Sequence, residues 1–86
     1  SFQEWSDGMD EWIAEVDQFM AKLIVHDCYD SAPTYSRTYT EKRKGDDIDL
    51  AVKNGWVEIV DRNRRETTVH LLEKGRELVL REKRNG

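Results

Sequence analysis

The sequence has few of the residues that constrain a chain covalently or conformationally. Its 86 residues include a single cysteine, Cys28, and a single proline, Pro33. One cysteine cannot form an internal disulfide, so the fold does not depend on an oxidising compartment. Uncharged apolar runs such as residues 23–25 are far shorter than the roughly 20 residues of a membrane-spanning helix. Because no basic segment followed by an apolar stretch opens the chain, we expect no signal peptide, no membrane association and a cytoplasmic location.

The residue sets typical of enzymes and metal sites are also missing. Two histidines and one cysteine cannot by themselves supply the four Cys or His ligands of a structural zinc site. There is no glycine-rich phosphate loop, and the carboxylate pairs fall on helical faces rather than around an evident cleft. The length permits one domain and excludes a multi-domain cofactor enzyme. We therefore expect a protein that is not an enzyme and holds no metal and no cofactor.

Charge, by contrast, is abundant and unevenly distributed. The formal net charge is −4, with 18 acidic and 14 basic residues. Residues 1–30 carry eight acids and one base, whereas residues 31–86 carry ten acids and thirteen bases. The net charge therefore averages an acidic segment and a basic one, and it does not by itself exclude nucleic acid as a partner.

The N-terminal segment, residues 1–26, is predicted to form one long helix. Apolar side chains recur in it at alternating spacings of three and four, at Phe2, Trp5, Met9, Trp12, Val16, Phe19 and Leu23. This spacing is that of the a and d positions of a heptad repeat. Two interpretations follow: the stripe packs on the protein's own core, or it forms the seam of a helix–helix dimer. Each can hold for a different half of the helix.

Residues 31–55 are predicted to contain two further elements. Pro33 interrupts the helical pattern. Residues 34–40 fit either a short helix that begins at Pro33 or a strand rich in Thr and Tyr, and we favour the helix. A basic turn follows at residues 41–45. Asp46 or Asp47 can then cap a helix that ends at Asn54-Gly55.

The C-terminal part is predicted to contain a β-hairpin and a helix. Residues 56–60 and 66–71 alternate like strands, and the segment 61–65 between them has the length of a hairpin loop. The last helix spans residues 72–84. The chain is therefore expected to be a single α+β domain over residues 1–86.

The order of these elements resembles that of a winged helix-turn-helix domain. Residues 50–58 resemble the end of a recognition helix that runs into the first wing strand, and residues 61–65 and 69–78 are similar to the wing and following helix of MarR-like regulators. That family has an Asp-Arg-Arg wing tip and then a Leu-Thr-x-x-Gly step into the last helix. The matching residues here are Arg64, Arg65, Leu71 and Gly75. Asn63 stands where the family has Asp, and Leu72 where it has Thr.

The resemblance implies a winged helix-turn-helix fold with a long N-terminal helix that can dimerise, a helix-turn-helix and two-stranded wing over residues 31–72, and a C-terminal helix over 72–84. It implies a homodimeric transcriptional regulator that binds double-stranded DNA. Cationic side chains would meet phosphates at the basic turn and at the wing tip. The candidate DNA-binding residues are Lys42, Arg43, Lys44, Lys53, Arg62, Arg64, Arg65 and Arg37.

One feature of the expected recognition helix opposes this function. Asp46, Asp47 and Asp49 lie in its first turn, where carboxylates suit the helix dipole but repel phosphate. The alternative is therefore a protein–protein interaction module of the same fold that uses its acidic helices as the contact surface.

Overall fold

The computed structural model describes the backbone of residues 2–85 and the side chains of residues 15–85. The elements follow the order α1 (Phe2–Asp30), β1 (Ser36–Thr40), α2 (Glu41–Lys53), β2 (Val57–Arg62), β3 (Glu66–Leu71) and α3 (Glu73–Asn85). The fold is α+β, as expected, with three helices and a three-stranded antiparallel sheet in the described residues. This arrangement is compatible with a winged-helix layout.

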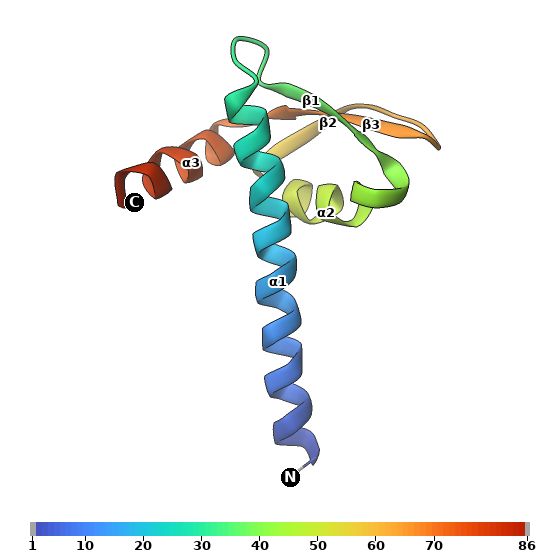
Figure 1. Cartoon of the computed structure of the whole chain (residues 1–86), viewed down its shortest axis with the longest axis vertical. Helices are drawn as coiled ribbons and strands as arrows, with labels where there is room; N and C mark the ends of the chain where they lie inside the picture. Colours follow the sequence, from blue (N-terminus) through green and yellow to red (C-terminus); the bar gives the residue numbers. More distant parts are fainter. Residues whose placement is uncertain (1, 86) are drawn as a thin grey trace.

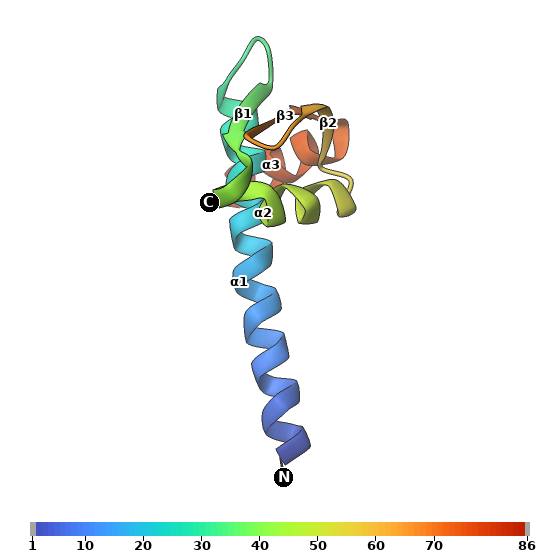
Figure 2. The same ribbon diagram turned by 90° about the vertical axis from the view of Figure 1, so that its right-hand side faces the viewer.

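Helix α1 has two parts with different surroundings. Its C-terminal half packs against the sheet and the other two helices, while its N-terminal half projects from the body as a free rod (Figure 1; Figure 2). The residues of α1 that enter the core are Ala21, Ile24, Val25 and Cys28, all buried. The expected stripe at Val16, Phe19 and Leu23 lies on another face and is exposed. Of the two interpretations of the stripe, packing on the protein's own core is therefore wrong for these three residues.

The sheet has the strand order β1-β3-β2, so β3 is central. Alternate residues of β3, namely Thr67, Val69 and Leu71, are buried against the helices. Thr68 and His70 point to the opposite face, as strand periodicity requires. A bulge between Ile59 and Asp61 interrupts the pairing of β2 with β3.

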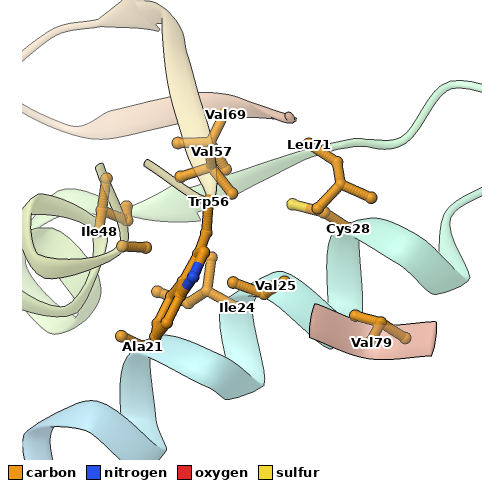
Figure 3. Packing of buried hydrophobic residues seen from close by; sticks show 11 residues of the cluster. Ala21, Ile24, Val25, Cys28, Ile48, Trp56, Val57, Val69, Leu71 and Val79 are labelled. Atoms are coloured by element: carbon orange, nitrogen blue, oxygen red, sulfur yellow. The ribbon is translucent and has the colours of Figure 1, made fainter. Parts of the chain in front are cut away.

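The core joins α1, α2, α3 and the sheet in one cluster. Its buried apolar residues are Ala21, Ile24, Val25, Cys28, Ile48, Ala51, Trp56, Val57, Val69, Leu71 and Val79. Figure 3 shows the Trp56 indole extending from the start of the hairpin toward Ala21 and Ile24. Gly75 of α3 lies so close to this point that a Cβ on it would be 2.3 Å from the carbonyl oxygen of Trp56. The residue therefore has to be glycine for α3 to dock here.

Residues 34–40 are not the short helix that we favoured from the sequence. Ser36–Thr40 forms β1, which pairs antiparallel with β3 from Ser36 opposite His70 to Thr40 opposite Glu66. Tyr35 enters this strand with a φ of 54° and its carbonyl oxygen accepts a hydrogen bond from the amide of Leu71, at 2.8 Å. Pairing with a central strand thus satisfies the backbone of a segment whose Thr and Tyr content already suited a strand.

Helix α2 also begins earlier than expected. It starts at Glu41, with Thr40 as the N-cap residue, so residues 41–45 are helical rather than a basic turn, and Asp46 and Asp47 lie inside the helix. In the described chain α2 is the one helix between β1 and β2, whereas the favoured interpretation of the sequence places two successive helices before the hairpin. The hairpin and the last helix match the prediction within two residues at their ends.

Candidate nucleic-acid interface

The turn between β2 and β3 is held in shape by Asn63. Its Oδ1 accepts hydrogen bonds from the backbone amides of Arg65, at 2.8 Å, and Glu66, at 2.9 Å. The Asn63 amide in turn donates to the carbonyl oxygen of Glu66, at 3.0 Å. A side-chain oxygen that accepts hydrogen bonds from backbone amides in this way holds a tight turn in one conformation. Arg64 and Arg65 are therefore displayed at the tip of a defined hairpin, and both are exposed.

The start of α2 is attached to this turn. The backbone amide of Glu41 donates a hydrogen bond to the carbonyl oxygen of Arg65, at 2.9 Å. Figure 1 shows the end of β1 and the start of α2 beside the tip of the β2–β3 hairpin. Lys42 and Arg43 follow directly and are exposed. The structure thus brings together four of the predicted cations, Lys42, Arg43, Arg64 and Arg65, which we call the basic surface.

Arg62 is placed differently, because its guanidinium faces α2. Its Nε donates to Glu41 Oε1 at 3.0 Å, its Nη1 donates to Asp49 Oδ1 at 2.7 Å, and its Nη2 also contacts Glu41 Oε1. The Oγ1 of the fully buried Thr67 donates to the other oxygen of Glu41. Hydrogen bonds from Arg62 and then from Thr67 lower the pKa of the Glu41 carboxyl. Arg62 therefore joins the hairpin to α2, and we leave it out of the basic surface.

The other three candidate cations lie elsewhere. Lys44 is half-buried in the first turns of α2, and Lys53 is exposed in its last turn, at the opposite end of the helix from the hairpin tip. Arg37 stands opposite Val69 in the sheet, so it lies on the face that the helices cover, at the edge strand β1. None of the three is part of the basic surface.

The three aspartates of α2 have separate environments. Asp49 is paired with Arg62, and Asp46 is exposed without a described ion pair. Asp47 is half-buried. Burial raises the pKa of its carboxyl, with Asp17 of α1 and Asp46 acting in the same direction and Lys44 opposing them. Only Asp49 is therefore neutralised by a contact within α2 and the hairpin.

A second candidate surface lies on α1. The apolar stripe, defined here as Val16, Phe19 and Leu23, is 44%, 60% and 39% exposed. Phe19 also lines a shallow hollow of about 390 Å³ with Glu15, Gln18 and Lys22. The remaining stripe residues predicted from the sequence fall outside the side chains that the structure describes: they are Phe2, Trp5, Met9 and Trp12. The described half of the predicted dimer seam is free of the protein's own core.

Sequence reasoning missed the residues that organise the site. Glu41 and Asp49 act through Arg62, which is distant from both along the chain, and no short motif links them. Asn63 could have been found, because an asparagine inside a hairpin loop commonly accepts hydrogen bonds from the amides two and three residues on. Of the three aspartates that oppose DNA binding in the sequence, Asp49 therefore helps to position the hairpin, and Glu41 does so as well.

Two pairs of side chains contact each other at a cavity beside α3. A cavity of about 270 Å³ is lined by Tyr35, His70, Leu71, Leu72, Glu73 and Arg76. In it, His70 Nδ1 lies 2.8 Å from Ser36 Oγ, and the Arg76 guanidinium lies 5.3 Å from the centre of the Tyr35 ring. Within the part of the chain that the structure describes, no three His, Cys, Asp or Glu side chains are grouped to hold a metal ion.

None of the helices in residues 2–85 combines the length and apolar character that a membrane crossing requires. Comparisons of the chain with models of protein families, with curated proteins and with solved structures find no match.

Proposed function

We propose that the chain is a small winged-helix protein that binds double-stranded DNA as a homodimer and acts as a transcriptional regulator. One observation carries the proposal: the hydrogen bond between the Glu41 amide and the Arg65 carbonyl oxygen unites two basic segments. Lys42 and Arg43 thereby lie beside Arg64 and Arg65. Four exposed cations on one surface suit a duplex backbone, which carries one negative charge per about 1.7 Å.

The layout of the elements supports the winged-helix part of the proposal. A helix leads into an antiparallel hairpin with an arginine-rich tip, and a helix follows the hairpin. The carboxylate of Glu41 does not cancel the basic surface, because Arg62 and Thr67 already engage both of its oxygens. The net charge of the basic surface therefore stays positive where phosphate would approach.

The apolar stripe supports the dimer. Phe19 is 60% exposed on a helix that projects from the body, and Val16 and Leu23 continue the same face. Burying one such side chain against a second copy stabilises the assembly by about 1.5–3 kcal/mol. A two-fold dimer would present two basic surfaces to one duplex.

A titration of a labelled random-sequence duplex by fluorescence anisotropy, repeated at several salt concentrations, tests the DNA-binding function. We expect micromolar binding at low salt that weakens steeply as salt rises, with a logarithmic slope of about −0.9 for each phosphate contacted. The Arg64→Ala/Arg65→Ala variant should lower both the affinity and the slope. The matched control is Arg81→Ala/Arg84→Ala, which removes the same charge from exposed positions on α3, away from the hairpin (Figure 1). Binding that the control weakens as much as the test variant would refute the assigned surface.

A protein-interaction module is the second candidate function. It is favoured by the exposed Asp46 and by the acidic α1, whose apolar stripe could equally receive another protein. Absence of any binding to duplex DNA at low salt, with the protein folded, would favour this function over the first.

A further inference from the structure

The outward face of α2 carries charges of opposite sign in its first turn and in its middle. The exposed residues along it are Lys42, Arg43, Asp46, Asp49 and Lys53, which follow one another at the spacing of a helix face. The first turn is cationic, whereas the middle is carboxylate. A helix that reads bases in the major groove places its middle and first turns against the base edges.

The middle of this face is also joined to the hairpin by an ion pair. Arg62 crosses from β2 to reach Asp49 and Glu41, and its side chain is only 32% exposed. Gly45 provides room for this contact, since a Cβ there would lie 2.8 Å from Glu41 Oε1 and 3.6 Å from Arg62 Nη2. Asp49 is therefore already paired with a side chain of the hairpin, on the segment of α2 that a DNA-reading helix would leave free.

The side chains that remain are poorly suited to base recognition. Asp can accept a hydrogen bond from the N4 amine of cytosine, but Arg, Lys, Asn and Gln, which read guanine and adenine, are absent from the middle of α2, residues 45–52. Asp46 would also approach the phosphates on either side of the groove and be repelled by them. Entry of α2 into the major groove thus gains few contacts and costs electrostatic energy.

We propose that the basic surface binds the phosphate backbone of duplex DNA with little regard to base sequence, and that Asp46 together with the Asp49–Arg62 pair keeps α2 out of the major groove. This inference rests on the proposed DNA-binding function. The contacts come from Lys42 and Arg43 on one side and from Arg64 and Arg65 on the other. The hydrogen bonds of Glu41 hold these two groups side by side, and contacts to phosphates from such a surface carry no direct sequence information.

Anisotropy titrations of the whole chain against duplexes of equal length test the inference, with A·T-only, G·C-only and several mixed sequences at one salt concentration. We expect affinities within about threefold of one another, because phosphate contacts carry no direct sequence information. Asp46→Asn should strengthen binding to every duplex by a similar factor of about two to five, since it removes a negative charge near the phosphates. The matched control Glu77→Gln, on the exposed face of α3, should leave all affinities unchanged.

The titrations distinguish base reading by α2, binding to the phosphate backbone alone, and no DNA binding. A preference of tenfold or more for one mixed sequence, lost in Asp46→Asn, would show that α2 reads bases and would overturn the inference while leaving DNA binding intact. Equal affinities with a uniform gain in Asp46→Asn would support it. If no duplex binds at low salt, the proposed function itself fails and this inference falls with it.

Discussion

The guanidinium of Arg62 donates from Nε to the Oε1 atom of Glu41, at 3.0 Å, and so joins the end of β2 to the first residue of α2. The same carboxylate accepts a hydrogen bond from the buried hydroxyl of Thr67 in β3. One acidic side chain therefore connects both strands of the hairpin to the helix. The direction in which the basic surface points depends on this connection.

Acid should weaken the protein partly through Glu41. The pKa of its carboxyl is below the ordinary value of 4.5 in the folded state, because Arg62 and Thr67 donate hydrogen bonds to the charged form. A lowered pKa means stability that is fully present above about pH 4.5 and is lost as the pH falls through the folded-state value. We expect the melting temperature of Glu41→Gln to depend less on pH than that of the wild type below pH 5. Glu58→Gln, exposed on β2, is the control and should follow the wild-type profile.

Gly75→Ala should destabilise the fold although alanine is the better helix former. The new Cβ would lie 2.3 Å from the Trp56 carbonyl oxygen and 2.8 Å from Leu71 Cδ1, so α3 would have to move. We expect a loss of about 2–4 kcal/mol in the free energy of unfolding, measured by urea denaturation. Gly45→Ala is the matched control inside α2. Its Cβ meets the Glu41 carboxylate, a side-chain end that can shift at the cost of part of its contact with Arg62. The higher helix propensity of alanine offsets part of this cost, and a loss below about 1 kcal/mol is expected. Equal losses in both variants would contradict the tight docking of α3.

The elements that the sequence located correctly are those that local patterns determine. The hairpin follows from two alternating runs and a polar loop, and the last helix from apolar spacing after Leu71. Residues 34–40 could not be decided locally, since their state depends on pairing with β3, about 30 residues later. The helical preference of a segment this short is too small to resist such pairing.

Local sequence patterns also predicted only part of the candidate site. Arg64 and Arg65 were predicted because an exposed hairpin tip is a local feature. The sequence did not predict that the Arg62 side chain points toward α2. Its partners Glu41 and Asp49 are distant along the chain and come close to it only in the folded structure. The heptad spacing of α1 located a real apolar stripe at Val16, Phe19 and Leu23, but it could not show that the core uses the neighbouring face.

Phe19→Glu should separate assembly from folding. Phe19 is 60% exposed, so the change removes no core contact, but it places a charge in the middle of the proposed seam. We expect a monomer with an unchanged circular dichroism spectrum, where the wild type is a dimer, as measured by size exclusion with light scattering. Val60→Glu adds the same charge at an apolar site of β2 that is 62% exposed, and it should leave the dimer intact. A wild-type protein that is monomeric at high concentration would contradict the seam.

Lys42→Ala/Arg43→Ala should weaken DNA binding about as much as Arg64→Ala/Arg65→Ala, since the Glu41–Arg65 hydrogen bond makes the two pairs parts of one surface. Each removed phosphate contact should reduce the logarithmic salt slope by about 0.9. The single variant Lys53→Ala removes a lysine from the far end of the same helix and should change the affinity by less than about twofold. The comparison by anisotropy therefore distinguishes binding at the start of α2 from binding along its whole length. A loss in Lys53→Ala as large as that in a matched single variant, Lys42→Ala, would mean that α2 lies along the DNA and would contradict the proposed arrangement.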